Sequence, residues 1–216
     1  MTNLFRSNNN RFLFIELIIL FILLPLVLLL PVTVQFKVGG ILIGVVYVLV
    51  LTVKTKVVSP ESLYIFSQRP YWKYVFLRFI ILAIVSVVFI YFYMPEKLFI
   101  VIKKNFLFWM MLSAFYSVFS VYPQEFLYRS FFFARYKKLI KSPNRFILLN
   151  ATLFSLAHIG FKNPLVLGIT FVGGIVFAIT YTKTKSLMFT SIEHALYGAW
   201  LFTVGAGEML AFPMPK

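Results

Sequence analysis

Long apolar segments are the feature that most constrains this chain. Of its 216 residues, 61% are hydrophobic and 12% are charged, and the mean hydropathy is +0.92. A soluble domain is about 45–50% apolar and about 25% charged, so a water-soluble core cannot bury this excess. A lipid bilayer must then be the solvent for most of the surface. The sequence therefore predicts an all-α, polytopic transmembrane helical bundle.

The apolar segments define about seven spans on the scale of about 20 residues that a crossing requires. The first follows a basic start and contains Pro25 and Pro31; no small-residue cleavage site follows it, so we expect a retained anchor. The second carries Gly40 and Gly44 at a spacing typical of close helix packing. The predicted spans are 11–34, 38–53, 74–94, a stretch within 105–136, 145–161, 164–181 and 186–205.

The stretch 105–136 is too long for a single crossing. Its 32 residues would extend about 48 Å as one helix, against a hydrocarbon core of about 30 Å. Pro123 lacks a backbone donor, so we expect a break or kink there, with a helix opening at this proline. We predict one membrane domain, in which residues 1–104 form N-terminal helices with an interfacial loop or helix at 59–73, and residues 105–216 form the core helices.

The charge balance is strongly basic, with 21 Lys and Arg against 6 acids and a net charge of +15. In a soluble protein this would suggest nucleic acid, but beside apolar spans it indicates basic loops against anionic lipid. With the N-terminus inside, thirteen basic residues fall on the inner side and six on the outer side. We therefore expect the cytoplasmic membrane, with the N-terminus in, the C-terminus out, and residues 135–145 as an inner loop.

Few residue types are left for chemistry. The chain has no cysteine, which excludes disulfides, thiolate nucleophiles and zinc–thiolate sites. Its two histidines, His158 and His194, both lie in apolar sequence, as do Glu125, Arg129 and Glu193. Ionisable residues within spans are costly and usually face the protein interior, so these five are the candidate functional residues.

Their spacing suggests two chemistries. Glu125 and Arg129 are four residues apart and can form an ion pair, which could also be purely structural. In the first chemistry, a buried glutamate is the general base for a water molecule, and His158 and His194 stabilise the oxyanion. In the second, Glu125, His158 and His194 bind a zinc ion that keeps an open position for water.

Three ordered motifs resemble the CAAX-protease and bacteriocin-processing family (CPBP, also called Abi) of intramembrane proteases. The family pattern is E-E-x-x-x-R, then F-x-x-x-H, then H-x-x-x-N or H-x-x-x-D. The corresponding residues here are Gln124-Glu125-x-x-x-Arg129, Phe154-x-x-x-His158 and His194-x-x-x-Gly198.

The resemblance implies a membrane-embedded peptidase acting on a membrane-associated peptide or protein, with no nucleic acid. It favours a mechanism without metal or other cofactor, zinc being the second choice. The implied catalytic residues are Glu125, His158 and His194. The supporting residues are Gln124, Arg129, Glu193 and Asn150.

Two departures from the pattern affect the site. Gln124 replaces the glutamate to which the family assigns water activation, and an amide cannot accept that proton at neutral pH. Glu125 is the first candidate to inherit the role, although adjacent helix positions differ by about 100°, so the helix must be rotated. Glu193 is the second candidate.

Gly198 lacks the expected amide or carboxylate, for which Tyr197 or Asn150 is a candidate replacement.

Two other functions remain open from the sequence. Gln124 and Gly198 suit a catalytically inactive CPBP-like scaffold or immunity protein. Buried glutamate and histidine also suit a transporter or proton relay, although the chain shows no paired halves of the kind that many transporters have.

Overall fold

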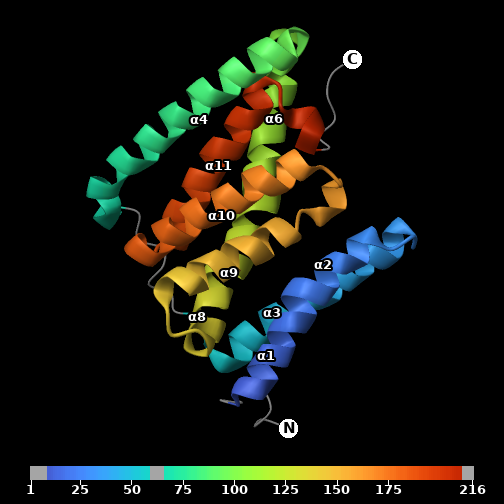
Figure 1. Ribbon diagram of the computed structural model, residues 1–216, viewed down its shortest axis with the longest axis vertical. Helices are drawn as coiled ribbons and strands as arrows, with labels where there is room; N and C mark the ends of the chain where they lie inside the picture. The colour runs from blue at the N-terminus through green and yellow to red at the C-terminus, as the bar shows by residue number, and fades with distance from the viewer. Residues whose placement is uncertain (1–8, 59–65, 211–216) are drawn as a thin grey trace. The chain divides into compact units, whose positions relative to one another are not determined.

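The computed structural model describes residues 9–58 and 66–210, and this part of the chain is helical without strands (Figure 1). The all-α prediction is thus confirmed. Five helices in the described ranges are long and apolar enough to cross a membrane: Asn10–Leu29, Val34–Thr55, Arg69–Tyr93, Phe106–Leu139 and Pro164–Thr184. The segments predicted at 145–161 and 186–205 are also helices, but they have 14 and 18 residues. Residues 59–65 of the predicted interfacial loop lie outside the described ranges.

The chain divides into two compact units, and each draws on both halves of the sequence. Unit one contains residues 1–60 and 126–179, and unit two contains residues 61–125 and 180–216.

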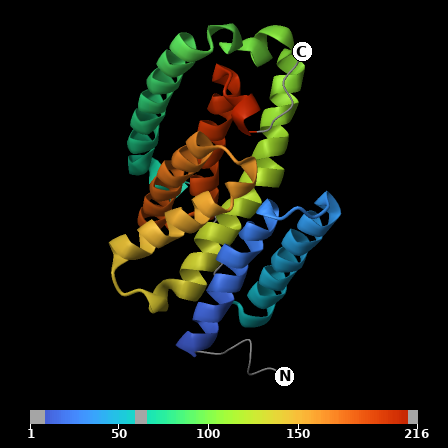
Figure 2. The ribbon, with the colours of Figure 1, turned by 45° about the vertical axis from the view of Figure 1, so that its right-hand side comes forward.

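Unit one is built around an N-terminal helical hairpin whose two arms lie side by side (Figure 2). A Cβ on Gly44 would lie 2.5 Å from Leu24 Cδ2, so this glycine permits the close approach that its spacing predicts. The elements of the unit are α1 (Asn10–Ile18), η1 (Ile19–Leu23), α2 (Leu24–Leu26), η2 (Val27–Leu29), α3 (Val34–Thr55), η7 (Phe126–Phe131), α8 (Phe132–Tyr136), η8 (Lys137–Leu139), α9 (Pro143–Leu156), η9 (Ile159–Phe161) and most of α10 (Pro164–Thr184).

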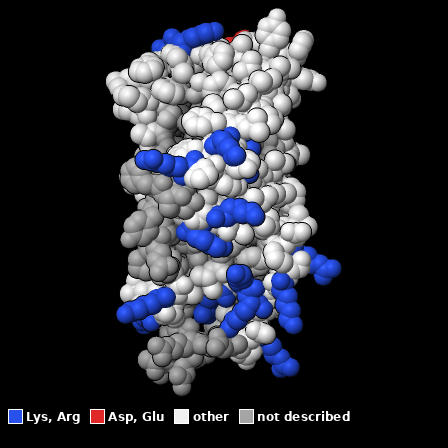
Figure 3. Space-filling view, turned by 90° about the vertical axis from the view of Figure 1, so that its left-hand side faces the viewer, with Lys and Arg blue, Asp and Glu red and all other residues white. Residues whose placement is uncertain are grey.

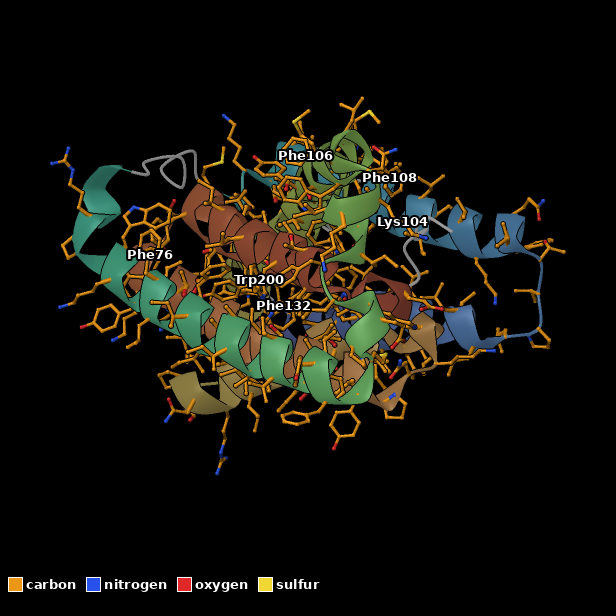
Figure 4. All side chains as sticks on the ribbon, turned by 90° about the horizontal axis from the view of Figure 1, so that it is seen from above. Phe76, Lys104, Phe106, Phe108, Phe132 and Trp200 are labelled. Carbon is orange, nitrogen blue, oxygen red and sulfur yellow. The ribbon has the colours of Figure 1, made fainter. Side chains whose placement is uncertain are left out.

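Unit two is organised around α11 (Leu187–Val204), which contacts α4, α5, α6, η6 and α7. Trp200, labelled in Figure 4, reaches from α11 to α4, where its indole N–H donates to Ser86 Oγ at 2.8 Å. The helix begins at the N-cap Ser186 and ends at Gly205, whose φ of 110° favours glycine. The other elements are η4 (Phe66–Tyr71), α4 (Trp72–Tyr93), η5 (Pro95–Lys97), α5 (Ile100–Lys104), α6 (Phe106–Phe115), η6 (Tyr116–Val121), α7 (Tyr122–Glu125), the end of α10 and η10 (Gly207–Leu210).

The helix that contains Pro123 continues through this residue, so the expected helix start there is wrong. The helix begins at Phe106, where the Asn105 side chain accepts a hydrogen bond from Phe108 N–H at 2.9 Å. The π-helical stretch η6 ends two residues before Pro123, just as η1 ends two residues before Pro25. A π turn changes the i→i−4 pairing that a proline would break, so it lets the helix continue without that hydrogen bond.

A buried ion pair links the first helix of unit one to α8. Arg135 Nε and Nη2 donate to the two oxygens of Glu16 at 2.9 Å each. Tyr136 and Tyr47 hydroxyls donate to the same carboxylate at 2.7 Å. Glu16 and Arg135 are 5% and 8% exposed. The prediction that Arg135 belongs to a basic loop is therefore wrong. Its partner Glu16 lies 119 residues away along the chain, so the charges of the residues near Arg135 could not indicate this pair.

The surface charge follows the composition. On the face drawn in Figure 3, Lys and Arg side chains far outnumber acidic ones, in keeping with the net charge of +15. The long apolar helices indicate an integral membrane protein, while the membrane and the orientation of the chain in it remain predictions.

We expect Glu16→Gln to lower the free energy of unfolding by about 3–5 kcal/mol, because it leaves the Arg135 guanidinium buried without a counter-charge. Thermal unfolding in detergent micelles measures this loss. Glu208→Gln is the matched control, since Glu208 pairs with Lys97 but is exposed, and such pairs contribute about 0–1 kcal/mol. Glu16→Gln/Arg135→Met should recover much of the loss. Equal midpoints for the two single variants would contradict the expectation.

Candidate functional site

The central contact of unit two joins Glu125 to His194. Glu125 is the last residue of α7, and His194 lies in the middle of α11, which packs against α7. His194 Nδ1 lies 2.8 Å from Glu125 Oε1, and the two residues are 7% and 0% exposed. An ionised carboxylate has no proton to give, so we assign the proton to Nδ1, which donates to Glu125. Two of the three predicted catalytic residues thus meet in one buried pair.

Tyr116 extends this pair on the opposite side of the imidazole. Its Oη lies 3.2 Å from His194 Nε2, and its ring packs edge-to-face on Phe202 with centroids 4.8 Å apart. With Nδ1 protonated, Nε2 is the acceptor and the phenol is the donor. The result is a chain of hydrogen bonds that runs from the partly buried Tyr116 through His194 to the fully buried Glu125.

Sequence reasoning missed Tyr116 because of the helix register. Positions nine residues apart, as Tyr116 and Glu125 are, face opposite sides of a regular α-helix at about 100° per residue. The π-helical η6, which begins at Tyr116, changes that register between them. No motif in the sequence marks such a stretch, so the pairing could not be read from the spacing.

Gln124 and Glu193, the residues next to the pair, have other partners. Gln124 Nε2 donates to Ser120 Oγ on its own helix at 2.8 Å. Glu193 Oε1 accepts from Arg78 Nη1 at 3.2 Å and from Tyr197 Oη at 2.8 Å. Because adjacent helix positions diverge by about 100°, Glu193 belongs to a separate cluster that also contains Thr180 and Tyr71, both bonded to Arg78.

The other predicted site residues lie in unit one. The Arg129 guanidinium donates to Asn150 Oδ1 and stacks 5.0 Å from the Phe154 ring, while Asn150 Nδ2 donates to Tyr128 O at 2.8 Å. Arg129 and Asn150 are fully buried.

His158 follows the C-terminal end of α9 in unit one. Its Nδ1 lies 2.8 Å from Phe154 O, so Nδ1–H donates to that carbonyl and Nε2 remains the acceptor. This hydrogen bond fixes the tautomer of His158. The meeting of His158 with Glu125 and His194 stays a prediction.

The Arg78 cluster predicts a structural role for Glu193. Arg78→Met should lower the free energy of unfolding by about 1–3 kcal/mol, because the fully buried Glu193 carboxylate loses its cation. Thermal unfolding of the purified protein gives the value. Lys73→Met, which removes an exposed cation five residues earlier on α4, should change little. If Glu193→Gln fails to rescue Arg78→Met, the pair does not provide the stability assigned to it.

Residues 103–200 match the family model for type II CAAX prenyl endopeptidase Rce1-like proteins. No curated protein and no solved structure gave a match. The matched range, slightly less than half of the chain, contains all three motifs and the Glu125–His194 pair, and at family level it implies a membrane peptidase. The resemblance carried by the motifs is thus confirmed, and over residues 103–200 the chain is similar to the Rce1-like CAAX prenyl endopeptidases.

Proposed function

We propose that this protein is an intramembrane endopeptidase of the CPBP type that hydrolyses peptide bonds with Glu125, His158 and His194. The observation that carries the proposal is the buried Glu125–His194 hydrogen bond of 2.8 Å, which lies within the range that matches CAAX prenyl endopeptidases. A buried glutamate held in place by a histidine is the kind of group that serves as a general base.

The proposed reaction needs one base and one oxyanion donor. Glu125 takes a proton from water as the water oxygen bonds to the peptide carbonyl carbon, and the carbonyl π electrons move to its oxygen. The oxyanion then re-forms the carbonyl, the C–N bond breaks, and the amine leaves with the proton held by Glu125. His158 is the proposed donor to the oxyanion through Nε2–H, which requires its ring to carry a second proton, because Nδ1–H is held by Phe154 O. His194 holds the Glu125 carboxylate through Nδ1–H.

Peptide cleavage is the direct test. The purified protein in liposomes is given a fluorescent peptide with a farnesylated CAAX-type C-terminus, the same peptide without its lipid, and a membrane-anchored leader-peptide reporter. We expect Glu125→Gln, His158→Ala and His194→Ala each to lower kcat/KM by at least about 100-fold on the cleaved substrate, as removal of a general base or an oxyanion donor does.

The control variant is Glu96→Gln, which neutralises an exposed carboxylate and should retain wild-type activity. All variants are compared at equal membrane abundance. Full activity in the three site variants would end the proposal. If the wild type binds a reporter without cleaving it, and Glu125→Gln binds that reporter equally well, the result would favour the inactive scaffold suggested by Gln124 and Gly198.

The metal-free mechanism is a separate prediction. We expect cleavage to persist after dialysis against a strong chelator, because the proposed base and donors are side chains. The measurement is kcat/KM before and after dialysis, with the zinc content of the protein determined in parallel. Loss of activity on chelation and its return with stoichiometric zinc would instead support Glu125, His158 and His194 as zinc ligands.

A further inference from the structure

The space beside Gly198 is already filled. Gly198 lies four residues after His194 on α11, so the two share one face of the helix. A Cβ built on Gly198 would lie 2.1 Å from Tyr116 Oη and 2.4 Å and 2.5 Å from two atoms of its ring. Contacts this short do not occur, so no side chain at position 198 can coexist with the observed position of Tyr116.

Tyr116 cannot easily move away from this position. Its ring packs edge-to-face on Phe202, with centroids 4.8 Å apart, and edge-on to His194, with centroids 6.1 Å apart. Phe202 itself is fully buried, and displacing packed aromatic rings in a core is costly. The glycine therefore provides the room that the phenol needs.

We propose that Tyr116 is the positioning residue of His194 and replaces the polar side chain that the motif H-x-x-x-N or H-x-x-x-D would place at position 198. The inference rests on the proposed function and adds a residue to that site. A side chain four residues after His194 would approach the imidazole along the same helix face. The Tyr116 hydroxyl occupies that space and lies 3.2 Å from His194 Nε2.

The consequence for His194 is a fixed tautomer and ring orientation. The Tyr116 O–H donates to Nε2, so Nδ1 carries the proton that is directed at the Glu125 carboxylate. The two replacements suggested by the sequence have other partners. Tyr197 donates to Glu193 Oε1 and contacts Val75 O, and Asn150 contacts Arg129 and Tyr128 in unit one.

A set of four variants tests the proposal by activity and by thermal unfolding. Tyr116→Phe removes one hydrogen bond while keeping the ring, so kcat/KM should fall about tenfold at an unchanged unfolding midpoint. Gly198→Asn should unfold at a lower temperature than the wild type, because its Cβ meets the phenol. Tyr116→Ala should lose activity, and Tyr116→Ala/Gly198→Asn should regain part of both activity and stability.

The ¹⁵N chemical shifts of the histidine rings test the positioning role directly, because a tyrosine that only stabilises the fold would not change them when its hydroxyl is removed. The chain contains two histidines, so the ¹⁵N-histidine-labelled protein shows two imidazole rings. Tyr116→Phe should shift the Nε2 resonance of His194 and leave the His158 resonances in place. Tyr122→Phe, at a partly exposed tyrosine on α7, is the matched control and should leave both rings and the activity unchanged.

The outcomes separate this inference from the proposed function. If the wild type cleaves no substrate, the proposed function fails, while the His194 resonances and the unfolding midpoints still decide whether Tyr116 holds the imidazole. Wild-type kcat/KM and an unchanged His194 spectrum in Tyr116→Phe would overturn the inference. Wild-type stability of Gly198→Asn would overturn it as well.

Discussion

Each buried carboxylate in the described part of the chain is matched by a specific partner, because an isolated charge in apolar surroundings is too costly to keep. Glu16 is held by Arg135, Glu193 by Arg78, and Glu125 by His194. The first two partners are guanidinium groups that stay protonated at any physiological pH. The third is an imidazole, which can donate through one ring nitrogen and accept through the other. This difference in partner distinguishes the two guanidinium-bound carboxylates from Glu125, the one for which we propose a role in catalysis.

The π-helical stretches determine where the third pair lies. The helix carrying Glu125 passes Pro123 without ending, and the two stretches around α7 alter which side chains share a face. Tyr116 and Glu125 would diverge in a regular α-helix, yet both reach His194. The proline and the site are therefore connected, since the irregularity that accommodates Pro123 also sets the register in which the polar side chains face α11.

The sequence was sufficient to predict features that depend on a local pattern of residues or on a residue type that occurs only a few times in the chain. Apolar length predicts the helices, and the confinement of both histidines to the ordered motifs predicts the Glu125–His194 contact. It was insufficient where a partner lies far along the chain, as for Arg135 and Glu16, or where the helix departs from the α period, as at Tyr116. Apolar length gives the number of spans only approximately: α9 and α11 have 14 and 18 residues, fewer than the five helices that meet the length and composition of a crossing.

The overlap between position 198 and Tyr116 also limits how this site can change by single substitutions. A glycine at 198 must be present before a tyrosine can occupy position 116 in this rotamer, and the tyrosine must be lost before any larger residue can enter at 198. One arrangement has Tyr116 with Gly198, and the other has a polar side chain at position 198 without Tyr116. A change from either one to the other must pass through a protein that has Gly198 but no tyrosine at 116, in which neither position contacts the imidazole.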